Sequence, residues 1–138
     1  MIILDTNVIS EPFAKSPDLR VAAWFDSQSA ETLYLSAVTV GELRYGIAAM
    51  PEGRRRDDYA AWLEDRTLPA FTGRILPYGV AETVEYARLR AAARAAGLAI
   101  ATADGMIAAT AAAAGFSVAT RDVSPFEAAG VTTIDPWQ

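Results

Sequence analysis

The sequence predicts an α/β fold, a parallel sheet of about five short strands with helices on both faces. Two observations carry this prediction. Short apolar runs alternate along the chain with segments of helical periodicity. The runs also lack the alternating polarity of strands that expose one face to water, which is typical of strands buried on both faces. The 138 residues contain no repeat, linker or low-complexity tail, so we expect a single domain over residues 1–138.

The expected strands are short, and each is bounded by residues that favour turns or caps. The first ends at Asp5-Thr6-Asn7, and the third ends at Pro77. In chain order the strands are Ile2–Leu4, Leu33–Leu35, Ile75–Leu76, Phe116–Ala119 and Val131–Ile134.

The expected helices of the first half each have a start or stop signal. Ser16-Pro17-Asp18 opens the first of them, with Ser16 as the cap and Pro17 in the first turn. Pro51 and Gly53 end the second, and Pro69 ends the third. These helices run from Ser16 to Phe25, from Ser36 to Ala49 through Val40, Leu43 and Ile47, and from Arg54 to Leu68 with Tyr59, Trp62 and Leu63 inward.

Three more helices are expected in the second half, and glycines end all of them. Gly97, Gly115 and Gly130 are the stop residues. The helices are Val80–Ala96, with Val84, Ala87 and Leu89 on its apolar face, Thr102–Ala114, and a short one that starts at Ser124-Pro125. With strands and helices alternating in this way, the sheet is expected to be parallel.

Composition excludes several kinds of chemistry. The chain has no cysteine and no histidine, which removes disulfides, Cys or His zinc sites, thiol nucleophiles and histidine general bases. The net charge of −5 repels nucleic acid and anionic membrane overall, so a polyanion must be held by local cations. The apolar stretch Met1–Leu4 is too short for a signal peptide, and the uncharged run Gly105–Thr120 is shorter than a membrane span. We expect a cytoplasmic protein without a membrane segment.

Four acids map to one edge of the predicted sheet, the edge where α/β proteins bind ligands. They are Asp5, Glu42, Asp104 and Asp122. Each has a structural alternative: Asp5 as a turn residue and cap, Asp104 as a favourable first-turn acid, Asp122 in a turn or a pair with Arg121, and Glu42 on a solvated helix edge.

Together the four acids indicate a metal site, because neighbouring anions repel unless a multivalent cation lies among them. Ligands that are all oxygen favour Mg²⁺ or Mn²⁺. Such an ion lowers the pKa of a bound water and stabilises charge on a phosphodiester, which indicates metal-assisted hydrolysis. Thr6, Asn7 and Thr120 are close enough in sequence to orient carboxylates or waters, with turn or cap roles as the alternative.

Four ordered motifs carry a family resemblance that spans nearly the whole chain. They are Ile3-Leu4-Asp5-Thr6-Asn7-Val8, the segment Ser36–Leu43 with Gly41-Glu42, the segment Ala103–Ala111 with Asp104-Gly105, and Val118-Ala119-Thr120-Arg121-Asp122. The chain resembles the PIN-domain family of Mg²⁺-dependent ribonucleases, and within it the VapC-type toxins of toxin–antitoxin pairs. Many relatives have Asn where Asp122 stands and an acid where this chain has Pro125. The Fit-type branch (FitB) is similar in having an acid directly after Thr-Arg and a closing Pro136-Trp137, which assigns the fourth acid to Asp122.

The resemblance implies an activity and partners. Asp5, Glu42, Asp104 and Asp122 would bind one or two divalent ions and act as the catalytic residues in RNA hydrolysis. The chain would form a homodimer and a complex with a small antitoxin. In such pairs DNA contact usually belongs to the antitoxin, so we expect no direct DNA binding. Candidate cations for holding RNA are Arg44, Arg121 and the run Arg54–Arg56, for which a solvated surface is the alternative.

Three other interpretations start from the same residues. A HAD-type phosphatase also has an acid after its first strand, but it needs a second Asp where this chain has Asn7. A nucleotide-binding Rossmann module is disfavoured because no G-x-G-x-x-G follows the first strand. A catalytically idle PIN fold that dimerises and binds a DNA-binding antitoxin stays open as the alternative function, although the presence of all four acids argues against it.

Overall fold

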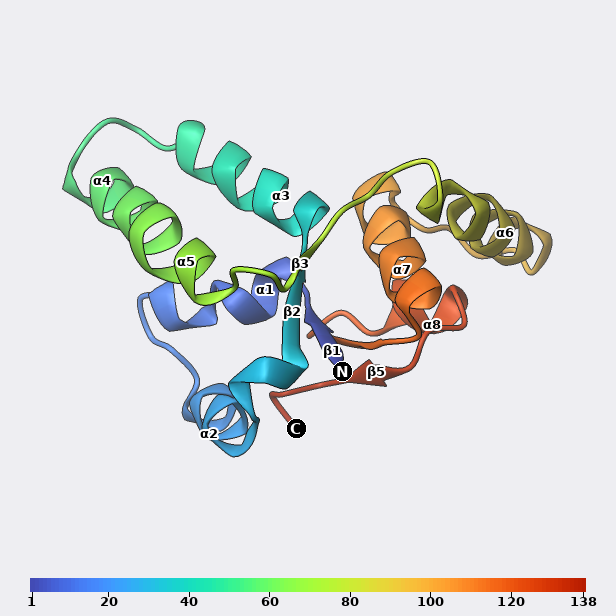
Figure 1. The fold of residues 1–138 in the computed structure, drawn as a ribbon, viewed down its shortest axis with the longest axis horizontal. Coiled ribbons are helices and arrows are strands. Elements are labelled where there is room, and N and C mark those ends of the chain that lie inside the picture. The colour runs from blue at the N-terminus through green and yellow to red at the C-terminus, as the bar shows by residue number, and fades with distance from the viewer.

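A computed structural model describes all of residues 1–138 (Figure 1). Five parallel strands form one sheet in the order β3-β2-β1-β4-β5. The strands are β1 (Ile2–Leu4), β2 (Leu33–Ser36), β3 (Ile75–Leu76), β4 (Ser117–Ala119) and β5 (Thr133–Ile134). The predicted parallel α/β fold is therefore confirmed, and all five strands fall within about two residues of their predicted bounds.

Helices of the first half cover one side of the sheet (Figure 1). They are α1 (Thr6–Ile9), α2 (Leu19–Ser27), α3 (Ala37–Ala48), α4 (Arg54–Ala61) and α5 (Leu68–Ala70), with 3₁₀ turns at Glu11–Phe13 and Ala30–Thr32. A π-helical stretch at Trp62–Thr67 joins α4 to α5 without a break. The predicted cap at Ser16 is wrong. Asp18 is the cap instead, because its carboxylate accepts a hydrogen bond from the Arg20 backbone N–H at 2.8 Å.

The second half contributes α6 (Glu82–Ala95), α7 (Thr102–Ala114) and α8 (Ser124–Ala128). The apolar face predicted for α6 is wrong in part, since Val84 is 70% exposed and Val80, just before the helix, is 87% exposed. Leu89 and Ala93 are the residues that α6 buries, in the core that it shares with α7. On a helix this rich in alanine, the spacing of apolar residues does not decide which stripe faces inward.

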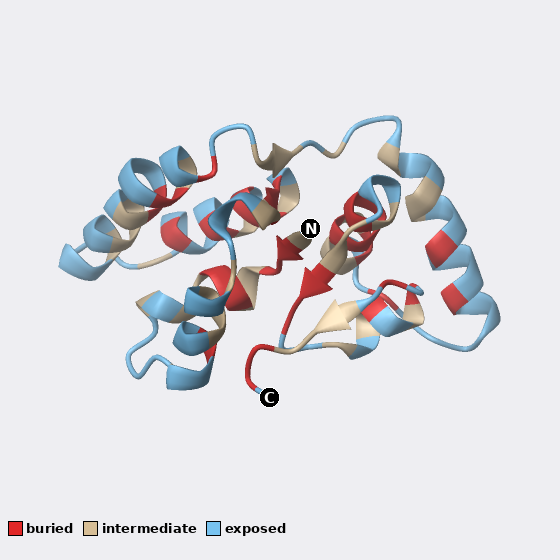
Figure 2. Ribbon diagram, turned by 60° about the horizontal axis from the view of Figure 1, so that its bottom comes forward, coloured by how far each residue is buried: buried red, intermediate tan, exposed pale blue.

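Two apolar cores lie on the two faces of the sheet, and β1 contributes to both (Figure 2). Leu4 packs among bulky aliphatic and aromatic side chains from α1 to α5. Ile3 packs on the other face among the alanines of α7 and Phe126 of α8. Because β1 is the middle strand and is buried on both faces, its carboxyl end is held firmly in the centre of the molecule. No helix in the structure has the length and apolar character needed to cross a bilayer.

Candidate functional site

Asp5 lies where the central strand ends. Its backbone N–H donates to the Ala119 carbonyl at 2.9 Å, which continues the pairing of β1 with β4 by one residue. The side chain caps α1, because one carboxylate oxygen, Oδ1, accepts from the Thr6 N–H at 2.8 Å. The cap interpretation of Asp5 is thus correct for one of its two oxygens.

The second oxygen of Asp5 faces two side chains from the predicted motifs. Oδ2 accepts from the Thr120 hydroxyl at 2.8 Å and from the Asn7 amide at 3.3 Å. Thr120 is fully buried at the end of β4, and its hydroxyl also accepts from the Asp122 N–H at 3.1 Å. The structure therefore brings Asp5, Asn7, Thr120 and the backbone of Asp122 into one hydrogen-bonded group.

Glu42 reaches the same edge from α3. Its Oε1 accepts from the Thr6 hydroxyl at 2.7 Å, which links α3 to the first residue of α1. The Ser36 hydroxyl accepts from the Val38 N–H at 3.1 Å and so caps α3 where β2 ends. Glu42 is half-buried on this helix, one turn and a half from the cap.

Asp104 and Asp122 complete the set of predicted acids. Asp104 is half-buried in the first turn of α7, and Asp122 is exposed in the turn after β4. Neither carboxylate forms a hydrogen bond or an ion pair within the protein, whereas Asp5 and Glu42 both do. The pairing of Asp122 with Arg121, considered from the sequence, does not form.

The charges of neighbouring acids raise the pKa of Asp5 and of Asp104. Burial raises the pKa of Asp5, hydrogen bonds from Thr120 and Thr6 oppose that rise, and the charges of Glu42 and Asp122 add to it. Partial burial likewise raises the pKa of Asp104, and the charges of Asp5 and Asp122 raise it further. The four side chains thus share one region of negative potential. As they are placed, no three acidic side chains in the structure are close enough together to hold a metal ion.

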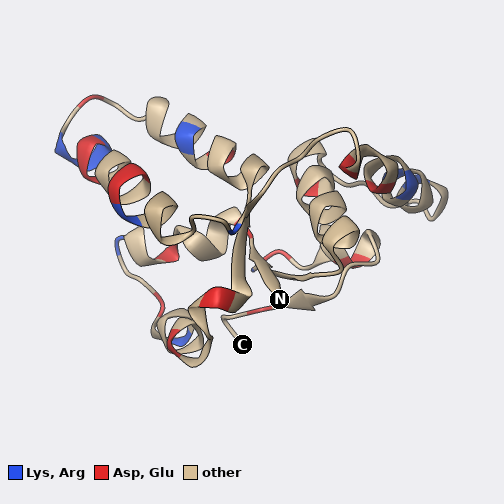
Figure 3. Cartoon of the chain, in the orientation of Figure 1, with Lys and Arg blue, Asp and Glu red and all other residues tan.

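The cations proposed for RNA binding are dispersed over the molecule (Figure 3). Arg44 points away from Glu42 and pairs with Glu64, its Nε lying 2.8 Å from the carboxylate. Arg55 lies over the Phe13 ring, in the first turn of α4. Arg121, between Thr120 and Asp122, stacks on the Trp137 ring at 5.1 Å from its centroid. Of the three sets, only Arg121 adjoins the acids.

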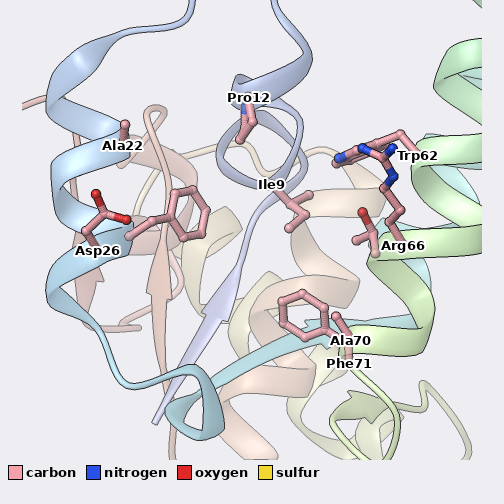
Figure 4. Close-up of a pocket in the computed structure, with 10 residues that line it drawn as sticks. Ile9, Pro12, Ala22, Asp26, Trp62, Arg66, Ala70 and Phe71 are labelled. Atoms are coloured by element: carbon pink, nitrogen blue, oxygen red, sulfur yellow. The ribbon is translucent and has the colours of Figure 1, made fainter.

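A groove of about 520 Å³ lies apart from the acids, between α1, α2 and the run from Trp62 to Phe71 (Figure 4). Ile9, Phe25 and Phe71 give it an apolar floor, and Asp26 and Arg66 lie on its walls. Sequence reasoning did not find this groove, because its residues come from three separate elements. The aromatic residues of α2 and of the π-helical stretch were the available signal, but such side chains are equally typical of a core.

Comparison with known proteins identifies the family. The PIN domain matches residues 2–131. The chain is 57% identical over 138 residues to VapC ribonuclease Y4jK from Sinorhizobium fredii, covering 100% of this chain and 99% of that one. It is 49% identical over 137 residues to Toxin FitB from Neisseria gonorrhoeae, covering 99% of each.

A solved structure agrees with these matches. A chain in the structure of FitAB bound to an IR36 DNA fragment superposes with a TM-score of 0.96 at 47% identity, covering 100% of this chain and 96% of that one. Because that assembly is bound to DNA, the prediction of no direct DNA binding is opposed in part. The match over nearly the whole sequence and the agreement in fold show that this chain belongs to the PIN domain family.

Proposed function

We propose that this chain, acting as a single PIN-like domain over residues 1–138, is a divalent-metal-dependent ribonuclease and the toxin of a toxin–antitoxin pair. The observation that carries the proposal is the buried carboxylate of Asp5, held at the end of the central strand with the charges of Glu42, Asp104 and Asp122 around it. An isolated protein gains no stability from such repulsion, so the arrangement favours a ligand that is positively charged. The names of the similar proteins, a VapC ribonuclease and a toxin, support the same activity.

The residues fit Mg²⁺ or Mn²⁺ by the chemistry of their donors, which are carboxylate oxygens with threonine hydroxyls beside them. Asp5, Glu42, Asp104 and Asp122 would hold the ion, which supplies the charge that activates water and stabilises a developing phosphodiester anion. Thr120 and Asn7 orient the Asp5 carboxylate, and Thr6 orients Glu42. Asp104 and Asp122, without partners in the protein, are the side chains free to turn toward the others.

The proposal is tested with the purified chain on a panel of structured and single-stranded RNAs in Mg²⁺, Mn²⁺ or chelator. We expect cleavage only with a divalent ion, and a loss of more than about a hundredfold in Asp5→Asn, since removing a ligand costs more than removing its outer partner. Asp65→Asn, which changes an exposed acid of the π-helical stretch, is the matched control and should cleave normally. Cleavage in chelator, or an active Asp5→Asn variant, would overturn the proposal.

The alternative is an idle PIN fold that serves only as the partner of an antitoxin. It predicts that no RNA is cleaved with either ion while the complex with antitoxin still forms. The hydrogen bonds that hold Asp5 and Glu42 at the edge of the sheet favour the enzyme, because a chain that only binds a partner gains nothing from carboxylates fixed near one another.

The antitoxin is proposed to dock an apolar segment in the groove of Figure 4. The groove is open to solvent and lined mainly by Ile9, Phe25, Trp62 and Phe71, which an apolar segment would cover. In the similar FitAB structure the assembly is bound to DNA, so we propose that this chain reaches DNA as part of such an assembly. A homodimer and a cytoplasmic location follow from the family resemblance and from an RNA substrate.

The groove is tested with Ala22→Glu, which adds a charge to an exposed position on its wall. We expect the cognate antitoxin to bind at least about tenfold more weakly, because the added carboxylate would be buried without a partner. Ala23→Glu adds the same charge to the next exposed residue of α2, outside the groove, and should bind antitoxin normally. Equal binding by Ala22→Glu, measured by calorimetry on the purified pair, would place the antitoxin elsewhere.

A further inference from the structure

A second cavity, of about 580 Å³, lies between α6 and the segment Leu98–Ile100 that leads back into α7. In Figure 1 the chain leaves the end of α6 and returns to the start of α7, whose first turn carries Asp104. Tyr86, Arg90 and Arg94 line the cavity from α6, with Leu98 and Ile100 from the returning segment. The cavity therefore lies next to the segment that leads into the first turn of α7.

The cavity is positively charged, unlike the protein as a whole. No acid lines it, and two arginines do. Arg88 on the same helix is neutralised by Glu85 at 2.6 Å, but neither Arg90 nor Arg94 is in any of the three ion pairs of the structure. In a chain of net charge −5, two unpaired cations around one cavity favour an anionic ligand there.

Arg90 is held in a defined position. Its Nη1 donates to the Tyr86 hydroxyl at 2.6 Å, and its guanidinium carbon lies 5.4 Å from the centroid of the same ring. Tyr86 is in turn packed edge-on against Tyr78, with ring centroids 6.1 Å apart. Because these contacts restrict the side chain before any ligand binds, a phosphate bound by Arg90 would cost less conformational entropy.

The cavity wall contacts the backbone next to Asp104. Gly105 follows that acid and is buried, and a Cβ at position 105 would lie 3.2 Å from Tyr86 Cε2 and 3.4 Å from Arg90 Cδ. A larger residue would have to push Tyr86 and Arg90 away. The glycine thus allows Tyr86 and Arg90 to pack directly against the first turn of α7, which also carries Asp104.

Resting on the proposed function, we infer that this cavity binds the phosphate backbone of single-stranded RNA next to the bond that is cleaved. Arg90 and Arg94 contact phosphates, and a strand lying across Asp104 continues into the cavity. This site adds positive charge to that of Arg121, which adjoins the acids, whereas Arg44 is paired with Glu64.

The test measures binding without cleavage. Every protein carries Asp5→Asn, Mg²⁺ is present, and the probe is a fluorescein-labelled single-stranded RNA 12-mer followed by anisotropy. We expect Arg90→Gln with Arg94→Gln to weaken binding about tenfold and to lower the salt slope by about 0.7 for each phosphate that is no longer neutralised, or about 1.4 for both. Arg88→Gln, with Arg90 and Arg94 intact, changes net charge on the same helix and should bind like its parent.

Arg94→Gln alone keeps the inference falsifiable if loss of the Arg90–Tyr86 bond affects folding, because the side chain of Arg94 forms no hydrogen bond or ion pair in the protein. Binding and salt slope of the double variant equal to those of Arg88→Gln would overturn the inference. In the protein with Asp5 restored, the arginine substitutions should raise KM and leave kcat nearly unchanged. Failure of the nuclease proposal is seen separately, as absent cleavage by the unsubstituted protein.

Discussion

The two halves of the acidic site are held in different ways. Asp5 and Glu42 accept hydrogen bonds from Thr6, Asn7 and Thr120, and Asp5 lies at the end of the central strand. Asp104 and Asp122 have no such partners, and they lie in the first turn of α7 and in an exposed turn. One half of the site is therefore fixed by the fold, and the other half can move.

The two halves of the site therefore carry different free-energy costs. Fixing a carboxylate in advance lowers the entropy lost when a ligand binds, but it keeps negative charge in a poorly solvated place. At Asp5, three hydrogen bonds offset the cost of that charge. Asp104 is also partly buried and repelled by neighbouring acids, but no hydrogen bond offsets its charge. The fixed half should control ion affinity through its neighbours, and the mobile half should control the stability of the ion-free protein.

Thr120→Val gives the larger expected effect, because it breaks the fixed half while keeping the shape of the side chain. It removes the hydroxyl that donates to Asp5 Oδ2 and that accepts from the Asp122 N–H. We expect Mn²⁺ affinity, measured by calorimetry, and RNA cleavage to fall about 10- to 100-fold, the usual range for a residue that orients a metal ligand.

Two variants separate positioning from a loss of stability. Thr120→Ser restores the hydroxyl and should recover most of the ion affinity. Thr110→Val removes another buried threonine hydroxyl, which bonds only to the Met106 carbonyl within α7, and should leave ion affinity unchanged. Equal losses in Thr120→Val and Thr110→Val would show that Thr120 contributes only to stability.

Sequence reasoning placed the strand ends well, because short apolar runs end at recognisable residues. A run such as Ile2–Leu4 that is apolar at every position is typical of a central strand, and the residue after it must lie at the ligand-binding edge. The motifs that contain Glu42, Asp104 and Thr120 flank or follow the same edge for the same reason. In a parallel sheet, residues that directly follow strands in the sequence therefore lie together at one edge.

The same reasoning failed where several elements share one surface. The groove beside Phe25 and Phe71, and the cavity beside Arg90, join residues that no spacing connects. On α6 the predicted face of Val84, Ala87 and Leu89 is right only at Leu89, which packs inward together with Ala93, whereas Val84 and Ala87 are exposed. Which face of α6 is buried depends on how α7 packs against it, and the sequence of α6 alone does not determine that packing.

The smaller expected effect concerns the mobile half and the stability of the ion-free protein. Because the pKa of Asp104 is raised by burial and by the charges of Asp5 and Asp122, the folded state binds this proton more tightly than the unfolded state. As pH rises from about 4 through that raised pKa, ionised Asp104 therefore destabilises the fold. Asp104→Asn removes the effect, and at pH 7 in chelator its Tm should exceed that of the parent by about 2–4 °C.

A pH series distinguishes this repulsion from a general effect of the substitution. The gain in Tm should shrink as pH falls through the raised pKa of Asp104, because the parent protein then binds the proton there. It should reverse when Mn²⁺ is added, since the parent alone would have its full set of ligands. Asp5→Asn should gain less or lose stability, because its amide N–H₂ cannot accept from Thr120 and Asn7 as the carboxylate oxygen does. Equal melting shifts for the two substitutions would show that hydrogen bonding does not distinguish the two halves of the site.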